Sequence, residues 1–175
     1  PMANAADAAA AEELTAGASI TASDGRTPTE LRDGSNYTRT AFSAGETLRI
    51  QSEEKISGIY IIWHKLYGSW TLTAGNTVKT CGTQGFLHEY VTLDTPAESV
   101  SLTLPQTDPA ICEIHLFSEG TLPDWVQVWN PPCEKADLML LSTHSDDEQL
   151  FFLGVLPYYA GELGLKVQVV YMTNH

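Results

Sequence analysis

Short runs of alternating apolar and polar residues fill the first two thirds of the chain. Segment 100–104 has Val or Leu at every second position with Ser and Thr between, which predicts a strand with one buried face. Segment 59–63 is apolar throughout, so it predicts a strand buried on both faces. The predicted strands are Thr47–Gln51, Ser57–Trp63, Ser69–Ala74, Glu89–Leu93, Ser99–Leu104 and Ile111–Phe117. Turn residues separate them, and this spacing favours an antiparallel jelly-roll sandwich in a mainly β protein.

The pattern changes after residues 120–135. Asp137–Thr143 is a nearly continuous apolar run, as expected of a parallel strand. Asp146–Gly161 predicts a helix that Pro157 kinks or ends, and Lys166–Met172 predicts a second strand. Together these elements predict the first β-α-β unit of an α/β Rossmann-like domain. Two parallel strands and one helix cannot close a core, so this domain is expected to be incomplete or completed by a partner.

Four segments follow from these patterns. Residues 1–13 are expected to be a disordered N-terminus or a cloning remnant, and 14–120 to form the sandwich. Residues 121–135 form a linker rich in Pro and Trp, which we expect to pack against a domain because Trp125 and Trp129 are large and apolar. The α/β segment spans 136–175.

Composition and charge restrict the class of partner. The 175 residues carry a formal net charge of -13, and no basic patch suits a nucleic-acid backbone or an anionic membrane surface. No apolar run approaches the ~20 residues of a transmembrane helix. A neutral or cationic partner, or a metal ion, fits this charge better. The Ala-rich start is compatible with the mature end of an exported, bacterial, extracellular or cell-surface protein.

The three cysteines match no metal-binding or redox motif. Buried thiols are the expected state of Cys81, Cys112 and Cys133, because free cysteine is usually buried. A Cys81–Cys112 disulfide is the alternative, and it would require an oxidising compartment.

Residues His144 to Glu148, here called the acidic turn, carry the clearest candidate chemistry. They follow the carboxyl end of a predicted parallel strand, where ligands bind in open α/β sheets. His144 and Asp147 could converge on Zn²⁺ or another divalent metal, and Asp146 could act as the catalytic base toward metal-bound water. The alternative is structural, because Ser145 and Glu148 fit the S-x-x-E helix capping box.

The run Ala136-Asp137-Leu138-Met139-Leu140-Leu141-Ser142-Thr143-His144-Ser145-Asp146-Asp147-Glu148 resembles the opening of the PIG-L (LmbE-like) N-deacetylase family, and the resemblance extends over Ala136 to Asn174. It implies that His144 and Asp147 bind zinc and that Asp146 is the general base. The implied reaction is hydrolysis of the N-acetyl amide of an amino sugar or glycoconjugate.

Two departures limit what the resemblance implies. Ser145 replaces the usual Pro, and His175 stands where the family often has Gly. The third metal ligand and the oxyanion-stabilising groups of the family lie beyond the matched residues. Because a catalytic zinc site typically has three protein ligands, we expect this chain alone to bind metal weakly and to be inactive without the remainder of the deacetylase domain.

Residues from about 14 to 119 resemble a discoidin-like (coagulation factor type C, galactose-binding) β-sandwich. The matching segments are Leu31–Gly34, Gly58–Trp63, Tyr67–Leu72, His88–Val91 and Ile111–Phe117. The resemblance implies a carbohydrate partner, with Trp63, Tyr67 and Trp70 as candidates for stacking on a sugar ring. The alternative is that these aromatic residues belong to the core. The resemblance also implies that Asp33 helps to hold a structural Ca²⁺; an ordinary Asp-Gly turn is the alternative.

Two functions therefore follow from the sequence. The first is a metal-dependent N-deacetylase with an accessory sugar-binding domain. The second is a non-catalytic carbohydrate-binding or adhesion module whose α/β segment is structural.

Overall fold

The computed structural model describes residues 9–129 and 133–173, and each of these two ranges forms a compact unit. The division lies inside the predicted linker 121–135. No helix among the described residues is long and apolar enough to cross a membrane. The two units are treated separately below, beginning with the larger one.

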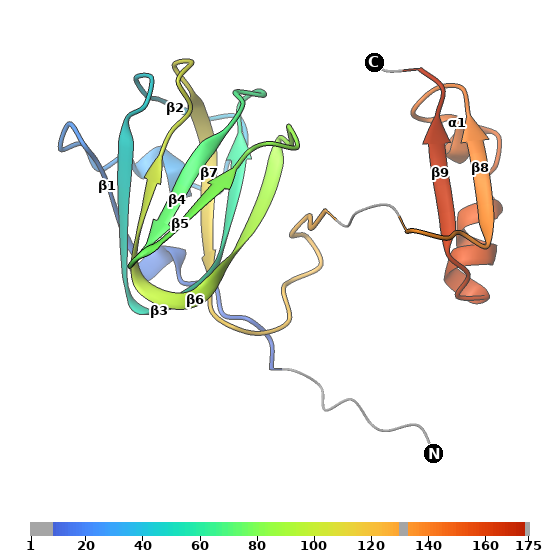
Figure 1. Ribbon diagram of the computed structural model, residues 1–175, viewed down its shortest axis with the longest axis horizontal. Helices are drawn as coiled ribbons and strands as arrows, with labels where there is room; N and C mark the ends of the chain where they lie inside the picture. The colour runs from blue at the N-terminus through green and yellow to red at the C-terminus, as the bar shows by residue number, and fades with distance from the viewer. Residues whose placement is uncertain (1–8, 130–132, 174–175) are drawn as a thin grey trace. The chain divides into compact units, whose positions relative to one another are not determined.

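The larger unit is an antiparallel β-sandwich (Figure 1). Its strands are β1 (Ser19–Ala22), β2 (Thr40–Ala41), β3 (Thr47–Trp63), β4 (Trp70–Ala74), β5 (Thr77–Cys81), β6 (His88–Thr103) and β7 (Ala110–Phe117). Two short 3-10 helices, η1 (Thr15–Gly17) and η2 (Thr29–Arg32), lie beside them. The fold class expected from the sequence, mainly β with an antiparallel sandwich, is confirmed.

The long strands β3 and β6 belong to both layers of the sandwich. The first half of β3 pairs with β1 and with the second half of β6, which also pairs with β4. The second half of β3 pairs with β7 and with the first half of β6. Register shifts between Gln51 and Gly58 mark the bend between these halves, as expected of β-bulges. Figure 1 shows both strands curving at one end of the sandwich.

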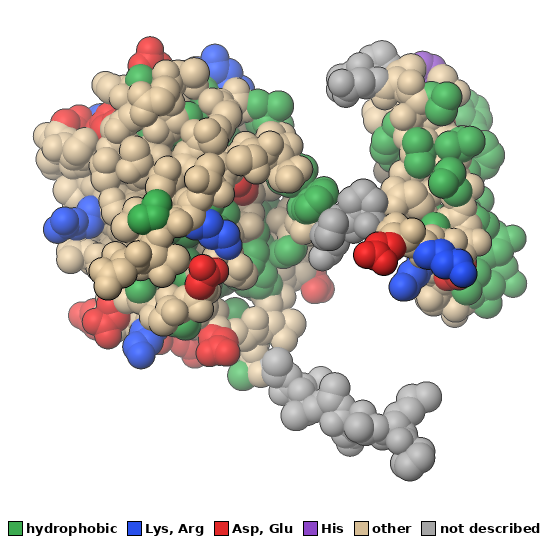
Figure 2. Space-filling view, in the orientation of Figure 1, with side chains coloured by type: hydrophobic (Ala, Val, Ile, Leu, Met, Phe, Trp, Pro, Cys, Tyr) green, Lys and Arg blue, Asp and Glu red, His purple; other side chains and the backbone are tan. Residues whose placement is uncertain are grey.

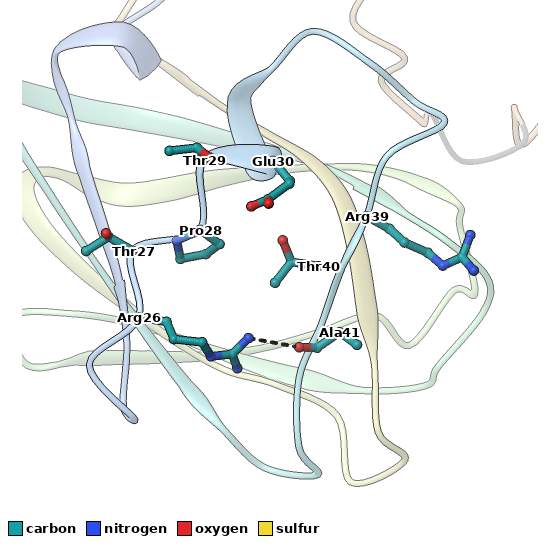
Figure 3. Close-up of a pocket in the computed structure, with 8 residues that line it drawn as sticks. All are labelled: Arg26, Thr27, Pro28, Thr29, Glu30, Arg39, Thr40 and Ala41. Atoms are coloured by element: carbon teal, nitrogen blue, oxygen red, sulfur yellow. Dashed lines mark hydrogen bonds between the residues drawn. The ribbon is translucent and has the colours of Figure 1, made fainter.

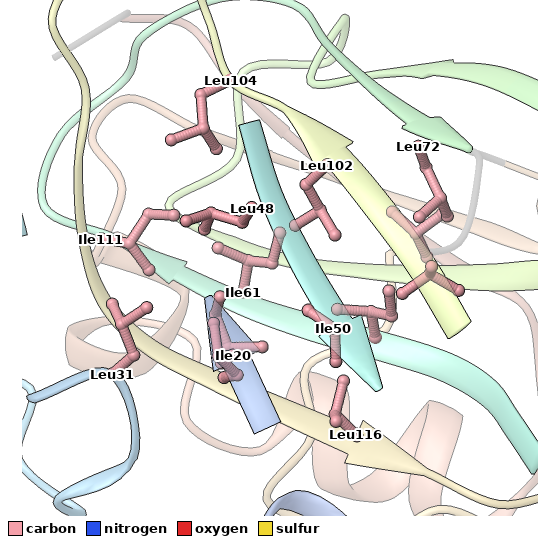
Figure 4. Packing of buried hydrophobic residues seen from close by; sticks show 14 of the residues in the cluster. Ile20, Leu31, Leu48, Ile50, Ile61, Leu72, Leu102, Leu104, Ile111 and Leu116 are labelled. Atoms are coloured by element: carbon pink, nitrogen blue, oxygen red, sulfur yellow. The ribbon is translucent and has the colours of Figure 1, made fainter. Parts of the chain in front are cut away.

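The main core lies between the two layers (Figure 4). Along the first half of β3, Leu48 and Ile50 are fully buried whereas Arg49 and Gln51 are exposed, so the alternation in the sequence sets which face meets the core. The largest fully buried aliphatic side chains are Leu31, Leu48, Ile50, Ile56, Ile59, Ile61, Leu102, Leu104, Ile111 and Ile114.

A second apolar cluster covers the outer face of the layer that contains β7. Tyr60, Ile62 and Cys112 point outward from this layer and are buried beneath Val126 of the predicted linker. Trp125 packs against the rings of Tyr60, His115 and Phe117, with centroid separations of 5.9, 4.9 and 5.8 Å. The expectation that this aromatic segment packs against a domain is therefore confirmed for residues 121–129.

The amino-terminal segment runs along the same layer. Residues 1–8 lie outside the described residues. Residues 9–13 are paired with the sandwich, because the Ala11 amide donates to Thr121 and the Ser118 amide donates to Glu12. An isolated bridge also joins Glu13 to Phe117. The expectation of a disordered segment is thus wrong for residues 9–13. Backbone hydrogen bonds hold this segment, and such bonds cannot be recognised from the pattern of side chains.

The sequence analysis divided the strands differently from the structure. It split β3 into Thr47–Gln51 and Ser57–Trp63, because the polar bend between them interrupts the apolar pattern. It split β6 into Glu89–Leu93 and Ser99–Leu104 for the same reason. It also missed β1, β2 and β5, which are short and rich in Thr.

The smaller unit contains a parallel pair, β8 (Leu138–Ser142) and β9 (Val167–Tyr171), with Leu138 opposite Val167. Between them lie α1 (Asp147–Leu150) and the π-helix η3 (Leu156–Glu162). The predicted parallel pair with an intervening helix is confirmed. The prediction of one continuous helix over Asp146–Gly161 is wrong, because the helix stops after one turn. Gly154 lies within the interruption and Pro157 in the first turn of η3, and both residues disfavour the interior of one continuous α-helix.

Much apolar surface of the smaller unit is exposed. On β8, Leu140 and Ser142 are buried, whereas Met139 and Leu141 on the opposite face are 61% and 58% exposed. Figure 2 shows hydrophobic side chains over much of the visible face of this unit. Further exposed apolar side chains are Leu150, Phe151, Leu153, Tyr158, Leu163 and Met172.

Candidate functional site

An open pocket of about 540 Å³ lies between η2 and β2 and is called the η2 pocket (Figure 3). Its lining residues are Arg26, Thr27, Pro28, Thr29, Glu30, Arg39, Thr40 and Ala41. Pro28 precedes η2 with φ −66°, a value that its ring enforces, and so directs the chain into the helix. Pairing of Thr40 with Ile111 on β7 holds the opposite wall in the sandwich. The volume is within the roughly 300–1,000 Å³ of typical small-molecule sites.

Two oxygen groups without partners face one another across this pocket. The Thr40 hydroxyl is buried and has no hydrogen-bond partner among the described residues. Glu30 is exposed, and no hydrogen bond or ion pair joins its carboxylate to the described residues. Figure 3 shows the Glu30 carboxylate directed toward Thr40. A buried hydroxyl without a partner is costly, so a ligand that satisfied it would gain affinity.

The two arginines of the η2 pocket differ in their availability. Arg26 is held in place, because its guanidinium pairs with Asp24 and Glu46 and donates to the Ala41 carbonyl at 3.4 Å. It also lies 5.4 Å from the centroid of the Phe42 ring. Arg39 is exposed and, in Figure 3, extends away from the middle of the pocket. The charge of Arg26 is therefore largely compensated by carboxylates, which reduces its attraction for an anionic ligand.

The chain between the two pocket walls folds around Asp33. Gly34 adopts φ +78°, so Asp33-Gly34 forms the turn that the sequence indicated. The Thr38 hydroxyl lies 2.9 and 2.8 Å from the two carboxylate oxygens of Asp33. The Ser35 amide donates to Asp33 at 2.9 Å and to Glu113 at 3.0 Å. Residues 33–38 are here called the Asp33 loop. Hydrogen bonds join the two ends of this loop to each other and attach the loop to β7.

Glu113 of β7 completes a pair of carboxyl groups with Asp33. Only 1% of Glu113 is exposed, and its second carboxylate oxygen has no hydrogen-bond partner among the described residues. Burial raises the pKa of Glu113, and the adjacent Asp33 carboxyl raises it further. The Thr38 hydroxyl lowers the pKa of Asp33. Two carboxyl groups, the Thr38 hydroxyl and the Ser35 carbonyl are oxygen ligands of the kind that Ca²⁺ prefers, and further oxygen atoms would be needed to reach its usual number of about 6–8.

The structure places the three predicted sugar-stacking residues in and beside the core. Trp63 and Trp70 are only 6% and 2% exposed, so their rings are not available to a ligand, and this part of the prediction is wrong. Both indole N–H groups donate to the same Glu89 carboxylate oxygen, at 3.2 and 2.7 Å. Tyr67 is partly exposed and packs beside Trp63, with ring centroids 6.0 Å apart. A stacking role remains a prediction for Tyr67 alone.

The cysteines are all free thiols. Cys81 and Cys112 are buried as expected, whereas Cys133 is exposed. Burial raises the pKa of Cys81 to about 11, and the nearby Glu89 carboxylate adds to the effect. The structure therefore contains buried thiols rather than the alternative Cys81–Cys112 disulfide.

The acidic turn follows the carboxyl end of β8, as predicted. The Asp147 carboxylate accepts the His144 backbone amide at 2.9 Å and lies 3.7 Å from its imidazole Nδ1. Asp146 is exposed and occupies the N-cap position of α1 without a side-chain cap. The Ser145 capping box is therefore not formed. The described residues contain no group of three His, Cys, Asp or Glu side chains placed to hold a metal, so they do not fit a complete zinc site.

The sequence analysis missed Glu30, Ser35, Thr38, Thr40 and Glu113 of these sites. Glu113 could have been noticed, because it is a carboxylate inside the apolar strand Ile111–Phe117. Glu30 and Thr40 carried no comparable signal, since isolated Glu and Thr residues are common in surface loops. Their proximity depends on the fold that brings η2 beside β2.

Comparison with known proteins adds several structural likenesses. No protein-family model and no curated protein matches the chain. A Clostridium perfringens structure named CpGH89CBM32-6 is 15% identical, covers 62% of this chain and 100% of its own, and has a TM-score of 0.48. A pectin-binding carbohydrate-binding module is 23% identical, covers 59% of this chain and 92% of its own, and has a TM-score of 0.44. A striped-bass serum fucolectin is 13% identical, covers 63% of this chain and 50% of its own, and has a TM-score of 0.46. At these identities and TM-scores, the likenesses say nothing about what this chain binds.

Proposed function

We propose that residues 9–129 form a carbohydrate-binding module whose ligand occupies the η2 pocket. The observation that carries this proposal is the buried Thr40 hydroxyl, which has no hydrogen-bond partner among the described residues, together with the exposed Glu30 carboxylate that is directed toward it. The resemblance of the sandwich to discoidin-like domains supports the same assignment, because such domains often bind sugars through their loops.

The chemistry of the pocket favours a neutral, hydroxyl-rich saccharide. A carboxylate accepts hydrogen bonds from hydroxyl groups, and the Thr40 hydroxyl can both donate and accept one. An acidic sugar would be repelled by Glu30, and Arg26 is already paired with Asp24 and Glu46. The formal net charge of -13 also disfavours an anionic polysaccharide.

A glycan array followed by calorimetric titration tests this assignment. We expect binding of neutral methyl glycosides, such as those of galactose or fucose, and weaker binding of oligogalacturonate. Thr40→Val and Glu30→Gln should each weaken binding roughly tenfold, the effect of losing one or two hydrogen bonds. Thr92→Val and Glu98→Gln, at exposed positions on β6, serve as matched controls. Absence of any neutral glycan ligand, or unchanged affinity in both pocket variants, would contradict the proposal.

Ca²⁺ is the metal that we propose for the Asp33 loop. Its ligands would be the carboxylates of Asp33 and Glu113, the Ser35 carbonyl and the Thr38 hydroxyl. The buried Glu113 oxygen without a partner supports this assignment, because a cation would compensate its charge. We expect Ca²⁺ to raise the thermal unfolding temperature of the chelator-treated protein, and Glu113→Gln to remove that response. An equal response in the variant would exclude Glu113 as a ligand.

A second function concerns the smaller unit. We infer from the PIG-L resemblance that it is part of a metal-dependent N-deacetylase domain, in which His144 and Asp147 bind the metal and Asp146 is the base. The observation in favour is the acidic turn at the carboxyl end of a parallel strand, with His144 and Asp147 adjacent. Two ligands are fewer than the three of a typical catalytic zinc site, so further ligands would come from the remainder of the domain.

Titration of the chain with zinc tests the ligand assignment. We expect weak binding that Asp147→Ala abolishes and Asp146→Asn retains, because a base need not be a ligand. Equal affinity in Asp147→Ala would eliminate this residue as a ligand. In a protein that includes the complete domain, Asp146→Asn should abolish acetate release, and retained turnover would exclude its role as the base.

A further inference from the structure

The carboxylate of Glu30 is an acceptor that the described residues leave uncompensated. It is directed toward the buried Thr40 hydroxyl in the η2 pocket (Figure 3), and no hydrogen bond or ion pair joins it to the described residues. Arg39, which also lines the pocket, extends away from its middle. A ligand that reaches Thr40 therefore lies beside a negative charge.

The second arginine of the pocket does not offset this charge. The Arg26 guanidinium pairs with Asp24 and, at 3.4 Å, with Glu46, whose side chain is only 7% exposed. Two carboxylates thus surround one guanidinium, so Arg26 and its two partners together carry a net negative charge. The formal net charge of -13 on the whole chain has the same sign. The electrostatic potential of the pocket therefore favours a ligand with a positive charge.

The hydrogen-bonding groups of the pocket also suit a group that only donates. An ammonium group has three N–H donors and no acceptor, whereas the Glu30 carboxylate only accepts and the Thr40 hydroxyl can accept. A neutral sugar hydroxyl can bond to the same atoms. The bond between an ammonium group and a carboxylate is charge-assisted, however, and is roughly twice as strong as a bond between neutral groups. Saccharides with a free amino group therefore form a third class, distinct from neutral and acidic saccharides.

We propose that the η2 pocket selects a saccharide with a free amino group over the N-acetylated form of the same sugar. The inference rests on the proposed saccharide-binding function and names the ligand class within it. Because Glu30 is exposed, water and salt screen its charge, so the preference is modest and depends on ionic strength. The N-acetyl hydrolysis proposed for the smaller unit would release an amine of this kind, although the preference follows from the pocket alone.

Calorimetric titration of the full chain with matched sugar pairs tests the preference. The pairs are methyl galactosaminide with methyl N-acetylgalactosaminide, and methyl glucosaminide with methyl N-acetylglucosaminide, at about pH 6, below the pKa of ordinary amines. In at least one pair, we expect the amino form to bind roughly fivefold more tightly, the effect of one exposed ion pair. An increase from about 0.05 to about 0.5 M NaCl should remove most of this difference, because salt screens the pair. Equal affinity of the two forms at low salt in both pairs would overturn the inference.

Three variants separate the charge of Glu30 from other contributions. Glu30→Gln should bind both forms of a pair with equal affinity, because the amide has the shape of the carboxylate without its charge. Thr40→Val should weaken both forms alike and leave their ratio unchanged. Glu98→Gln, at an exposed position on β6 outside the pocket, changes the net charge by the same amount and should keep the preference. An undiminished preference in Glu30→Gln would overturn the inference, and an equal reduction in Glu30→Gln and Glu98→Gln would assign the preference to the overall charge instead.

The outcomes distinguish this inference from the proposed function. If neutral methyl glycosides bind and the amino forms bind no more tightly, the inference fails and the saccharide-binding function stands. If no saccharide of either kind binds, the proposed function fails and the inference fails with it. A preference for the amino form that high salt and Glu30→Gln both remove, and that Glu98→Gln retains, supports both.

Discussion

Glu89 shows how a single buried carboxylate can organise several elements. One oxygen accepts the indole N–H groups of Trp63 on β3 and Trp70 on β4, and the other accepts the Gly82 amide at 2.6 Å. These bonds explain why two large aromatic residues with polar N–H groups are tolerated in the core. They also fix the loop that begins at Gly82 after β5.

We expect Glu89→Gln to destabilise the sandwich by about 3 kcal/mol, because charge-assisted bonds are lost and an amide donor then faces the indole donors. Glu98→Gln, an exposed position on the same strand, should change stability by less than about 0.5 kcal/mol. Urea unfolding followed by tryptophan fluorescence measures both variants. Equal midpoints for Glu89→Gln and the parent would show that the carboxylate charge contributes little.

Glu113 predicts a pH dependence of opposite sign to that of an ordinary ion-paired carboxylate. Its folded pKa is raised above the ordinary value of 4.5, so the folded state binds the proton more tightly than the unfolded state. The resulting stabilisation is present below the ordinary pKa and is lost as pH rises through the folded pKa. In chelator, the parent should therefore lose stability relative to Glu113→Gln as the pH rises from the ordinary pKa of 4.5 toward neutrality. Urea midpoints of both proteins across this range measure the difference, and parallel curves would contradict it.

The sequence identified single residues only where chemistry was locally concentrated. The acidic turn combines five polar residues after an apolar run, and its position at the end of β8 was predicted correctly. The Ser35 amide donates to both Asp33 and Glu113, which are 80 positions apart in the sequence, so no local pattern indicated that they lie close together. Burial of Trp63 and Trp70 likewise depends on Glu89, a partner that only the strand register reveals.

At the scale of elements, packing beside the bend in β3 requires a glycine. A Cβ atom at Gly58 would lie 2.0 Å from the Tyr90 hydroxyl on the paired strand β6. This residue follows the register shifts of β3 and is opposite Thr92. The absence of a side chain at Gly58 therefore lets the Tyr90 ring lie over this strand. The centroids of the Tyr90 and Phe117 rings are 6.5 Å apart.

We expect Gly58→Ala to destabilise the protein by about 1–3 kcal/mol, the usual range for overpacking. The cost should be smaller in a Tyr90→Leu background, which removes the atoms that the new methyl group meets, so the two substitutions couple. Gly17→Ala, where no atom lies within 4 Å of the added carbon, is the control. Additive effects of Gly58→Ala and Tyr90→Leu in urea unfolding would contradict this explanation.

Elements with a clear period were predicted well, and those defined by tertiary contacts were not. The strands β4 and β7 match their predicted ranges to within one residue at each end. The polar bends of β3 and β6 ended the predicted strands early, because the period-2 pattern stops although pairing continues. The helix after β8 ends sooner than the apolar pattern predicted, because Gly154 and Pro157 disfavour one continuous helix through this segment.

At the scale of the whole molecule, segment 121–129 behaves as part of the sandwich. Val126 and Leu122 cover Tyr60 and Cys112, and Trp125 packs on the same face. The predicted sandwich boundary at residue 120 would therefore remove the cover of the second apolar cluster. A boundary after Trp129 coincides with the end of the larger unit.

We expect a chain of residues 9–129 to unfold at the same urea concentration as the sandwich in the full chain. A chain of residues 9–120 should be less stable by several kcal/mol, because each large apolar side chain that loses its burial costs about 1.5–3 kcal/mol. It should also bind the dye ANS, which reports exposed apolar surface. Equal stability of the two shortened chains would show that segment 121–129 contributes nothing to the free energy of unfolding.

The continuity of β3 and β6 through both layers has a consequence for the folding reaction. Neither layer can assemble alone, because β3 and β6 each contribute one half to one layer and the other half to the second layer. Pairing of the second half of β3 with β7 joins residues 48 to 59 positions apart, and such distant pairings slow the search for the native state. We therefore expect the sandwich to refold as one cooperative unit on the millisecond-to-second scale, with stopped-flow fluorescence from Trp63 and Trp70 following a single exponential.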